Sequence, residues 1–182
     1  GSAIRDGDVI IGLPSTGLHT NGYSLARKIT FEVAGLGPDD PMPHTGHTAA
    51  EALMEPHVAY AKLMQVIMKL VDVHGMAHIT GGGITDNFPR ILPEGLGAEV
   101  DLTTWEVPGI FRFLQETGNV AESEMLRTFN VGQGFMFVVP PDQVDKAVEA
   151  FEMTGKQCTV MGRIIKGESR VFYKGNLRYA GK

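Results

Sequence analysis

The sequence predicts an α+β fold: a three-layer α/β/α domain with a mixed β-sheet covered by helices and containing βαβ units. Three observations lead to this prediction. Short apolar, β-branched runs alternate with segments whose apolar residues recur at helical spacing. Residues 135–165 show the order strand, helix, strand that is typical of a βαβ unit. The 182 residues, of which 43% are hydrophobic, suit one domain with its own core.

Six short apolar runs are predicted to be strands that join one sheet. The last two are separated by only four residues, so we expect them to form a hairpin. The predicted strands are residues 9–13, 76–79, 98–102, 135–139, 159–165 and 170–173.

Seven segments show helical periodicity or helix-forming composition. The clearest is 57–71, in which Ala59, Leu63, Val66 and Leu70 recur on one face that we expect to pack on the sheet. The predicted helices are residues 23–33, 48–54, 57–71, 86–92, 110–116, 122–129 and 142–153.

Composition narrows the function classes. A net charge of -5 argues against a nucleic-acid-binding surface, which usually carries a basic excess. The single cysteine, Cys158, excludes an internal disulfide and suits a reducing compartment. No run approaches the ~20 apolar residues of a membrane span, and no signal peptide is seen. We therefore expect a cytoplasmic protein that binds neither nucleic acid nor membrane.

Two loops share one design: "PSTGLHTNG", residues 14–22, and "TGGGITDN", residues 80–87. Each lies between an apolar strand and a predicted helix. Glycine lets the backbone approach a ligand, and N–H groups at a helix start suit a phosphate. The alternative is that Asn21 and Asp86 only cap helices while the glycines make turns. Neither loop is a Walker A or dinucleotide-binding sequence. The candidate phosphate-binding residues are Ser15, Thr16, Gly17, Thr20, Asn21, Gly22, Gly81, Gly82 and Gly83.

Further candidates are less specific. Arg90 and Arg127 could bind a phosphate in a bidentate manner, or could equally form structural ion pairs. His44 and His47 lack a third ligand nearby in the sequence, so no metal site is expected. His78 precedes the second loop and could simply position the end of the strand.

Three segments together resemble aminoimidazole ribonucleotide synthetase, also called phosphoribosylformylglycinamidine cyclo-ligase. They are "GDVIIGLPSTGLHTNGYSLARK", "HITGGGITDNFPRILPEG" and "RTFNVGQGF". The resemblance runs from Asp6 to about Tyr173 and covers only the C-terminal half of that family. We therefore expect an isolated domain at residues 3–175, with Gly1 and Ser2 left by tag cleavage and the N-terminal ATP-binding domain absent.

The resemblance implies a reaction. The family uses ATP to activate the formyl oxygen of formylglycinamidine ribonucleotide, and ring closure then gives aminoimidazole ribonucleotide, ADP and phosphate. It implies ATP and Mg²⁺ as cofactors, bound mainly by the missing N-terminal domain, and a homodimer in the full-length enzyme. His19 would be the catalytic histidine, in a polar loop where its ring is not expected to fill core volume. Thr16 and Thr20 stand where the family also has serine. The isolated chain is expected to be inactive.

Two other interpretations stay open. One is a domain of a related ATP-dependent enzyme, such as selenophosphate synthetase, the hydrogenase-maturation protein or thiamine-phosphate kinase. The other is a non-catalytic anion-binding or assembly domain. The match of "STGLHTNGYSLAR" and "HITGGGITDNFPRILP" favours the cyclo-ligase over the related enzymes.

Overall fold

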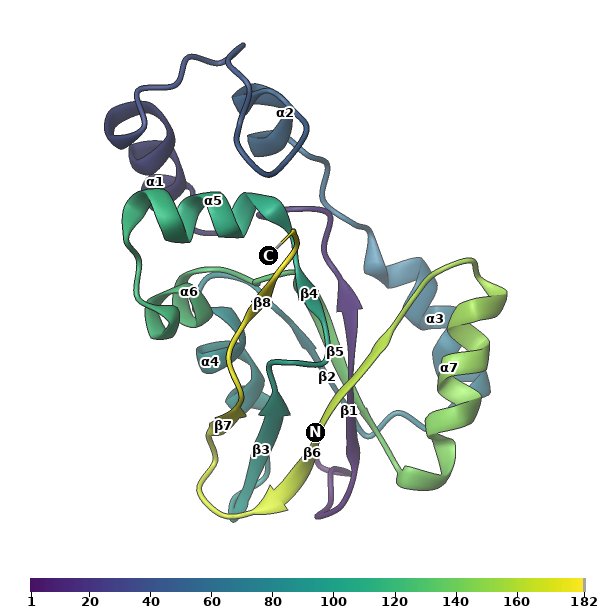
Figure 1. The fold of residues 1–182 in the computed structure, drawn as a ribbon. Coiled ribbons are helices and arrows are strands. Elements are labelled where there is room, and N and C mark those ends of the chain that lie inside the picture. Colours follow the sequence, from purple (N-terminus) through teal and green to yellow (C-terminus); the bar gives the residue numbers. More distant parts are fainter. Residues whose placement is uncertain (182) are drawn as a thin grey trace.

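A computed structural model describes residues 1–181 and shows a six-stranded mixed sheet (Figure 1). Its strand order is β2-β5-β1-β6-β3-β7, and every pair is antiparallel except β3 with β7. All six predicted strands join this sheet, as expected. The strands are β1 (Val9–Pro14), β2 (Gly75–His78), β3 (Leu96–Asp101), β5 (Gln133–Val139), β6 (Thr159–Lys166) and β7 (Val171–Lys174).

The predicted hairpin of the last two strands is wrong. β6 and β7 do not pair, because β3 lies between them and bonds antiparallel to β6 and parallel to β7. A four-residue connection usually joins neighbouring strands, but here β3 takes the central position. Ala98 and Val100 of β3 are fully buried there.

The predicted βαβ unit is present in a split form. β5 and β6 both run antiparallel to β1, so they are parallel to each other with β1 between them. The 3₁₀ turn η3 (Pro141–Gln143) and helix α7 (Val144–Met153) make the crossover.

A second, two-stranded sheet was not predicted. β4 (Glu106–Val107) pairs in parallel with β8 (Arg178–Tyr179). β8 lies beyond the expected domain end at residue 175. Leu177 and Tyr179 are buried, so the packed core extends to Tyr179.

Helices cover both faces of the main sheet, which gives three layers (Figure 1). A separate hydrophobic core lies on each face of the sheet, and side chains of β1 and β5 point alternately into one or the other. Ile11 and Phe137 pack in the core under α3 (Tyr60–Leu70) and α7, whereas Ile10 and Val138 pack in the core under the other helices. That second layer consists of α1 (Tyr23–Arg27), the π-helical segment η1 (Lys28–Val33), α2 (Ala49–Leu53), α4 (Gly83–Asn87), the 3₁₀ turn η2 (Phe88–Ile91), α5 (Gly109–Gly118) and α6 (Glu122–Thr128). Within residues 1–181, no helix is long and apolar enough to cross a membrane.

Helix α3 packs on the sheet as predicted, but through a different face. Tyr60, Met64 and Ile67 are buried, whereas Val66 and Leu70 of the predicted face are 48% and 44% exposed. The helix carries apolar residues at both sets of positions, so periodicity alone could not choose between them.

Candidate functional site

The sheet topology brings the three segments of the resemblance to one edge. β1 and β2 are both antiparallel to β5, so they run in the same direction and end where β5 begins. The first loop follows β1, the second follows β2, and "RTFNVGQGF" leads into β5. Segments far apart in the sequence therefore meet at the end of β1 (Figure 1).

Asn130 ties the first loop to the third segment. Its side chain is fully buried, and its Oδ1 accepts hydrogen bonds from Ser15 Oγ (2.8 Å) and from the backbone N–H of Gly132 (2.8 Å). Its Nδ2 donates to the carbonyl of Gly17 at 2.9 Å. These three bonds fix the course of the loop where it leaves β1, so Asn130 has a definite structural role.

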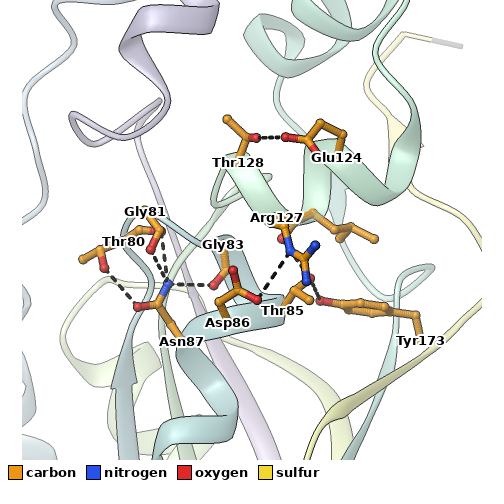
Figure 2. A network of polar contacts seen from close by, with 11 residues as sticks. Thr80, Gly81, Gly83, Thr85, Asp86, Asn87, Glu124, Arg127, Thr128 and Tyr173 are labelled. Carbon is orange, nitrogen blue, oxygen red and sulfur yellow. Dashed lines mark hydrogen bonds and ion pairs between the residues drawn. The ribbon is translucent and has the colours of Figure 1, made fainter.

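Asn87 organises the glycine-rich second loop (Figure 2). Its buried Nδ2 lies 3.2 Å, 3.1 Å and 2.8 Å from the carbonyl oxygens of Thr80, Gly81 and Gly83, and its Oδ1 accepts from the Thr80 hydroxyl. The carbonyls of the loop are thereby turned inward. Within residues 1–181, the N–H groups of Gly81 and Gly82 donate to no other protein group. Two backbone donors are thus left for a ligand.

The two loops are also in contact. Asn21 Nδ2 donates a long 3.5 Å hydrogen bond to the carbonyl of Ile79, the residue before the second loop.

Gly83 at the start of α4 lies against the end of α6, where an added Cβ would come within 2.0 Å of the Leu126 oxygen. The predicted side-chain caps are absent: Gly22 and Gly82 occupy the N-cap positions of α1 and α4 in the left-handed conformation.

His19 is buried rather than exposed, contrary to the expectation that it would not fill core volume. The residue is 3% exposed, and its Nε2 accepts a 3.1 Å hydrogen bond from the N–H of Thr16. The Thr16 hydroxyl donates to the carbonyl of Pro56, so it has no proton left for Nε2. The neutral ring therefore carries its proton on Nδ1, which is buried without a partner beside Gly134. Burial, and then the charges of two other histidines, lower the pKa of His19 to about 4.

The backbone of the first loop is strained at the same place. His19 and Thr20 have φ values of 51° and 60°, in the left-handed region that non-glycine residues rarely adopt. Such strain is commonly retained at functional sites.

Two further aromatic residues, which the sequence analysis did not single out, pack around His19. The ring of His57 stacks on His19 with centroids 4.0 Å apart and planes at 26°. Tyr60 lies 5.9 Å from His19, and His78 lies edge-on to His57 at 5.2 Å. Burial, followed by the charge of His57, lowers the pKa of His78. His57 and Tyr60 both belong to the "PHVAY" segment, residues 56–60, most of which was predicted to be the first turn of the helix 57–71. The helix begins only at Tyr60, so His57 lies in the preceding loop.

The remaining candidates lie apart from this cluster. Arg127 forms a 3.5 Å ion pair with Asp86 near the second loop (Figure 2). Arg90 is exposed on η2, and its neighbour Ile91 packs near Gly75, at the opposite end of β2 from the loop.

His44 and His47 each lie beside a different glutamate. Nε2 of His44 is 3.2 Å from a carboxylate oxygen of Glu116, and Nδ1 of His47 is 3.9 Å from one of Glu51. In the described part of the chain, no three His, Cys, Asp or Glu side chains could together hold a metal ion.

Comparison with known proteins places the fold and the three segments in one family. The model of the AIR synthase related protein, C-terminal domain, matches residues 5–174. The chain belongs to this family. The phosphoribosylformylglycinamidine cyclo-ligase of Desulfitobacterium hafniense (strain DSM 10664 / DCB-2) is 47% identical over 176 residues, which cover 95% of this chain and 50% of that protein. The cyclo-ligase of Geotalea daltonii is 46% identical over 166 residues, which cover 91% of this chain and 48% of that protein.

Solved structures share the fold of this AIR synthase related domain. Thiamine-monophosphate kinase from Stenotrophomonas maltophilia K279a has a TM-score of 0.65 at 17% identity and covers 96% of this chain. The hydrogenase maturation protein HypE of E. coli has a TM-score of 0.60, also at 17% identity. This AIR synthase related chain spans about half the length of the curated relatives it matches.

Proposed function

We propose that this domain supplies half of the active site of a phosphoribosylformylglycinamidine cyclo-ligase. The observation that carries the proposal is the convergence of both loops and the Asn130 segment at one sheet edge, where Asn130 bonds to Ser15 and Gly17. The 47% identity to proteins of that name favours this reaction over those of the more distant kinase and maturation proteins.

The substrate in this proposal is formylglycinamidine ribonucleotide, whose phosphate needs several donors. The unpaired N–H groups of Gly81 and Gly82 supply two, and a ligand can approach Gly81 because an added Cβ there would have no neighbour within 4 Å. In the first loop, the N–H groups of Thr20 and Gly22 likewise donate to no other group of residues 1–181. Backbone donors fixed before binding need no reorganisation, which favours charge stabilisation.

His19 acts in this proposal as a neutral donor. Its unpartnered Nδ1–H is the kind of buried polar group that calls for a ligand or a water molecule. A neutral imidazole N–H can stabilise negative charge that develops on an oxygen, such as the activated formyl oxygen. The pKa of about 4 argues against a charged His19 at neutral pH.

ATP and Mg²⁺ are proposed to bind mainly outside this chain. The described residues offer no cluster of ligands for a metal, and we route no step through magnesium here. The partner would be the ATP-binding half of the enzyme, in a cytoplasmic homodimer, and the isolated chain would be inactive.

A chimera tests the function. This chain is joined behind the first half of the D. hafniense cyclo-ligase and assayed for ATP-dependent formation of aminoimidazole ribonucleotide, with the chain alone as the control. We expect turnover from the chimera and none from the chain alone. A folded chimera that fails with this substrate but phosphorylates thiamine monophosphate would overturn the assignment.

A further inference from the structure

A cavity of about 450 Å³ lies beside the first loop, and the proposed function leaves it without a role. Among the described residues, its charged lining consists of two carboxylates, Glu106 and Glu152, with no lysine, arginine or histidine. Neither carboxylate has an ion-pair partner within residues 1–181. Arg178, opposite Glu106 in the second sheet, donates instead to the carbonyl of Thr103. The cavity therefore has a negative charge that its own walls do not neutralise.

Gln133 of β5 also lines the cavity, and its side-chain amide is unsatisfied. The residue is 2% exposed, its Oε1 is buried without a hydrogen-bond partner, and its Nε2 donates to no group of residues 1–181. Gly12 of β1 leaves room for this amide, because an added Cβ there would collide with Oε1 and with the sulfur of Met161. A buried amide without partners calls for a ligand or a water molecule.

No hydrogen bond fixes which end of the Gln133 amide faces the cavity. A half-turn about the last side-chain bond exchanges the oxygen and the nitrogen. It would place the NH₂ group beside the sulfur of Met161, which is a weak acceptor, and leave the oxygen for a ligand. Gln133 can therefore accept a hydrogen bond from an N–H group bound in the cavity.

Trp105 gives the cavity an aromatic wall. Its Nε1–H donates to the carbonyl of Val131 at 2.9 Å, which fixes the position of the indole ring. Tryptophan attracts cations to its ring more strongly than the other aromatic residues do. Cys158, also in the wall, adds no charge, since burial and then the charge of Glu152 raise the pKa of its thiol to about 11. An indole, two carboxylates and an amide acceptor together suit a flat cation that carries several N–H groups.

The cavity adjoins the first loop through Asn130. Ser15 and Gly132 both line the cavity, and the Ser15 hydroxyl and the Gly132 N–H both donate to Oδ1 of Asn130. Ser15 belongs to the loop that also carries His19. A ligand in the cavity therefore lies against the loop to which the proposed function assigns the chemistry.

We propose that this cavity binds an amidinium cation, which packs on Trp105, donates to the amide oxygen of Gln133 and is neutralised by Glu106 and Glu152. The inference rests on the proposed function for its ligand, because formylglycinamidine ribonucleotide carries an amidine. An amidine is a strong base and is protonated at neutral pH. The cavity thus holds the amidine end of the substrate, and its walls contain no group that would bind the phosphate.

Titration of the chain with acetamidinium chloride at pH 7 tests the inference. The chain contains one tryptophan, so its indole N–H signal in NMR and its fluorescence report on this cavity alone. Acetamide has the same shape without the charge, and methylammonium has the charge without the flat pair of N–H groups. We expect acetamidinium to bind at about millimolar concentration and the other two to bind about 5-fold more weakly or worse.

Three variants locate the binding. Gln133→Met removes the amide at nearly the same volume and should weaken acetamidinium binding about 10-fold, with an unchanged or higher melting temperature because an unsatisfied buried group is lost. Glu106→Gln combined with Glu152→Gln should weaken it about 2- to 5-fold, the size of exposed charge contacts. Glu149→Gln, the same change at an exposed position of α7 outside the cavity, is the matched control and should bind normally.

Wild-type acetamidinium affinity in Gln133→Met would overturn the inference, as would equal binding of methylammonium, or a loss in Glu149→Gln as large as in the double glutamate variant. If Gln133→Met did not fold, the double variant, which changes only exposed side chains, would decide in its place. None of these measurements needs turnover. Acetamidinium binding beside an inactive chimera would reject the proposed function and keep the cation site without its substrate, whereas an active chimera whose cavity ignored acetamidinium would do the reverse.

Discussion

The imidazole rings of His19 and His57 stack with centroids 4.0 Å apart, one ring buried and the other exposed. The N–H of Thr16 points at Nε2 of the buried ring, and so does that of Val58 at the longer distance of 3.5 Å. A proton on Nε2 would meet these donors, which agrees with the lowered pKa of His19. The loop is therefore built around a neutral histidine.

This neutral histidine predicts a pH dependence of stability. In the unfolded chain His19 takes up a proton near its ordinary pKa of 6.5, but in the folded chain only near 4. The unfolded state thus binds more protons between these values, and the free energy of unfolding falls as the pH is lowered from about 6.5 toward 4. His78, also lowered, adds to the same trend.

Urea denaturation of wild type and His19→Gln at pH 7 and pH 4.5 measures the effect. Other groups titrate in both proteins, so the difference between the two proteins in stability lost on acidification reports on His19. The variant should lose less stability than wild type on acidification. An equal or larger loss in the variant would contradict the prediction.

Asn130→Ala should destabilise the chain strongly. The substitution removes the acceptor of Ser15 Oγ and of the Gly132 N–H, and the donor to the Gly17 carbonyl, all of them buried contacts. Buried polar groups without partners cost about 1–3 kcal/mol each before relaxation, so we expect a loss of about 2–4 kcal/mol in urea denaturation. Asn176→Ala is the matched control at an exposed position, with a change within about 0.5 kcal/mol. A similar small change at Asn130 would mean that the bridge does not order the loop.

Two glycines of the second loop should respond differently to alanine. Gly83 has a φ of 58°, and an added Cβ would lie 2.0 Å from the Leu126 oxygen, so Gly83→Ala should cost about 3 kcal/mol or prevent folding. Gly81 has open space around the same position, so Gly81→Ala should fold normally. Its new methyl group would instead stand beside the N–H to which the proposed function assigns a phosphate.

Denaturation and phosphate titration by NMR distinguish the two glycines. Phosphate is expected to bind wild type only weakly, at millimolar concentration or above, and to shift the signals of residues 15–22 or 81–85. Unchanged phosphate binding in folded Gly81→Ala would remove the second loop from the site.

The strands of the sheet could be predicted from the sequence because they are short apolar runs separated by polar loops. The candidate loops, residues 14–22 and 80–87, could be recognised by their glycines. Strand neighbours were harder to predict. The insertion of β3 between β6 and β7 depends on pairing between distant residues such as Ala98 and Val171, which no local pattern encodes. The burial of His19 was missed for the same reason, since the groups that cover it, His57 and Val58, lie about forty residues away.

Two variants of His19 distinguish the structural role of its Nε2, which accepts a hydrogen bond in the loop, from the proposed role of its Nδ1–H as a donor to the substrate. Glutamine and asparagine serve for this because their side-chain amides mimic different ring nitrogens. Glutamine reaches the position of Nε2 and can accept from the N–H of Thr16, whereas asparagine reaches only as far as Nδ1 and can donate there. In the chain, His19→Asn should therefore lose about 1–3 kcal/mol of stability, the cost of an unsatisfied buried N–H, and His19→Gln should lose less. In the chimera the order should reverse: losing the Nδ1 donor in His19→Gln should lower turnover by about 10²–10³-fold, with a smaller loss in His19→Asn. Melting temperatures and steady-state turnover of both variants, beside the wild type, are the measurements. If both variants lost turnover equally while remaining folded, His19 would have to transfer a proton rather than donate a hydrogen bond, and near-normal turnover in both would limit it to ordering the loop.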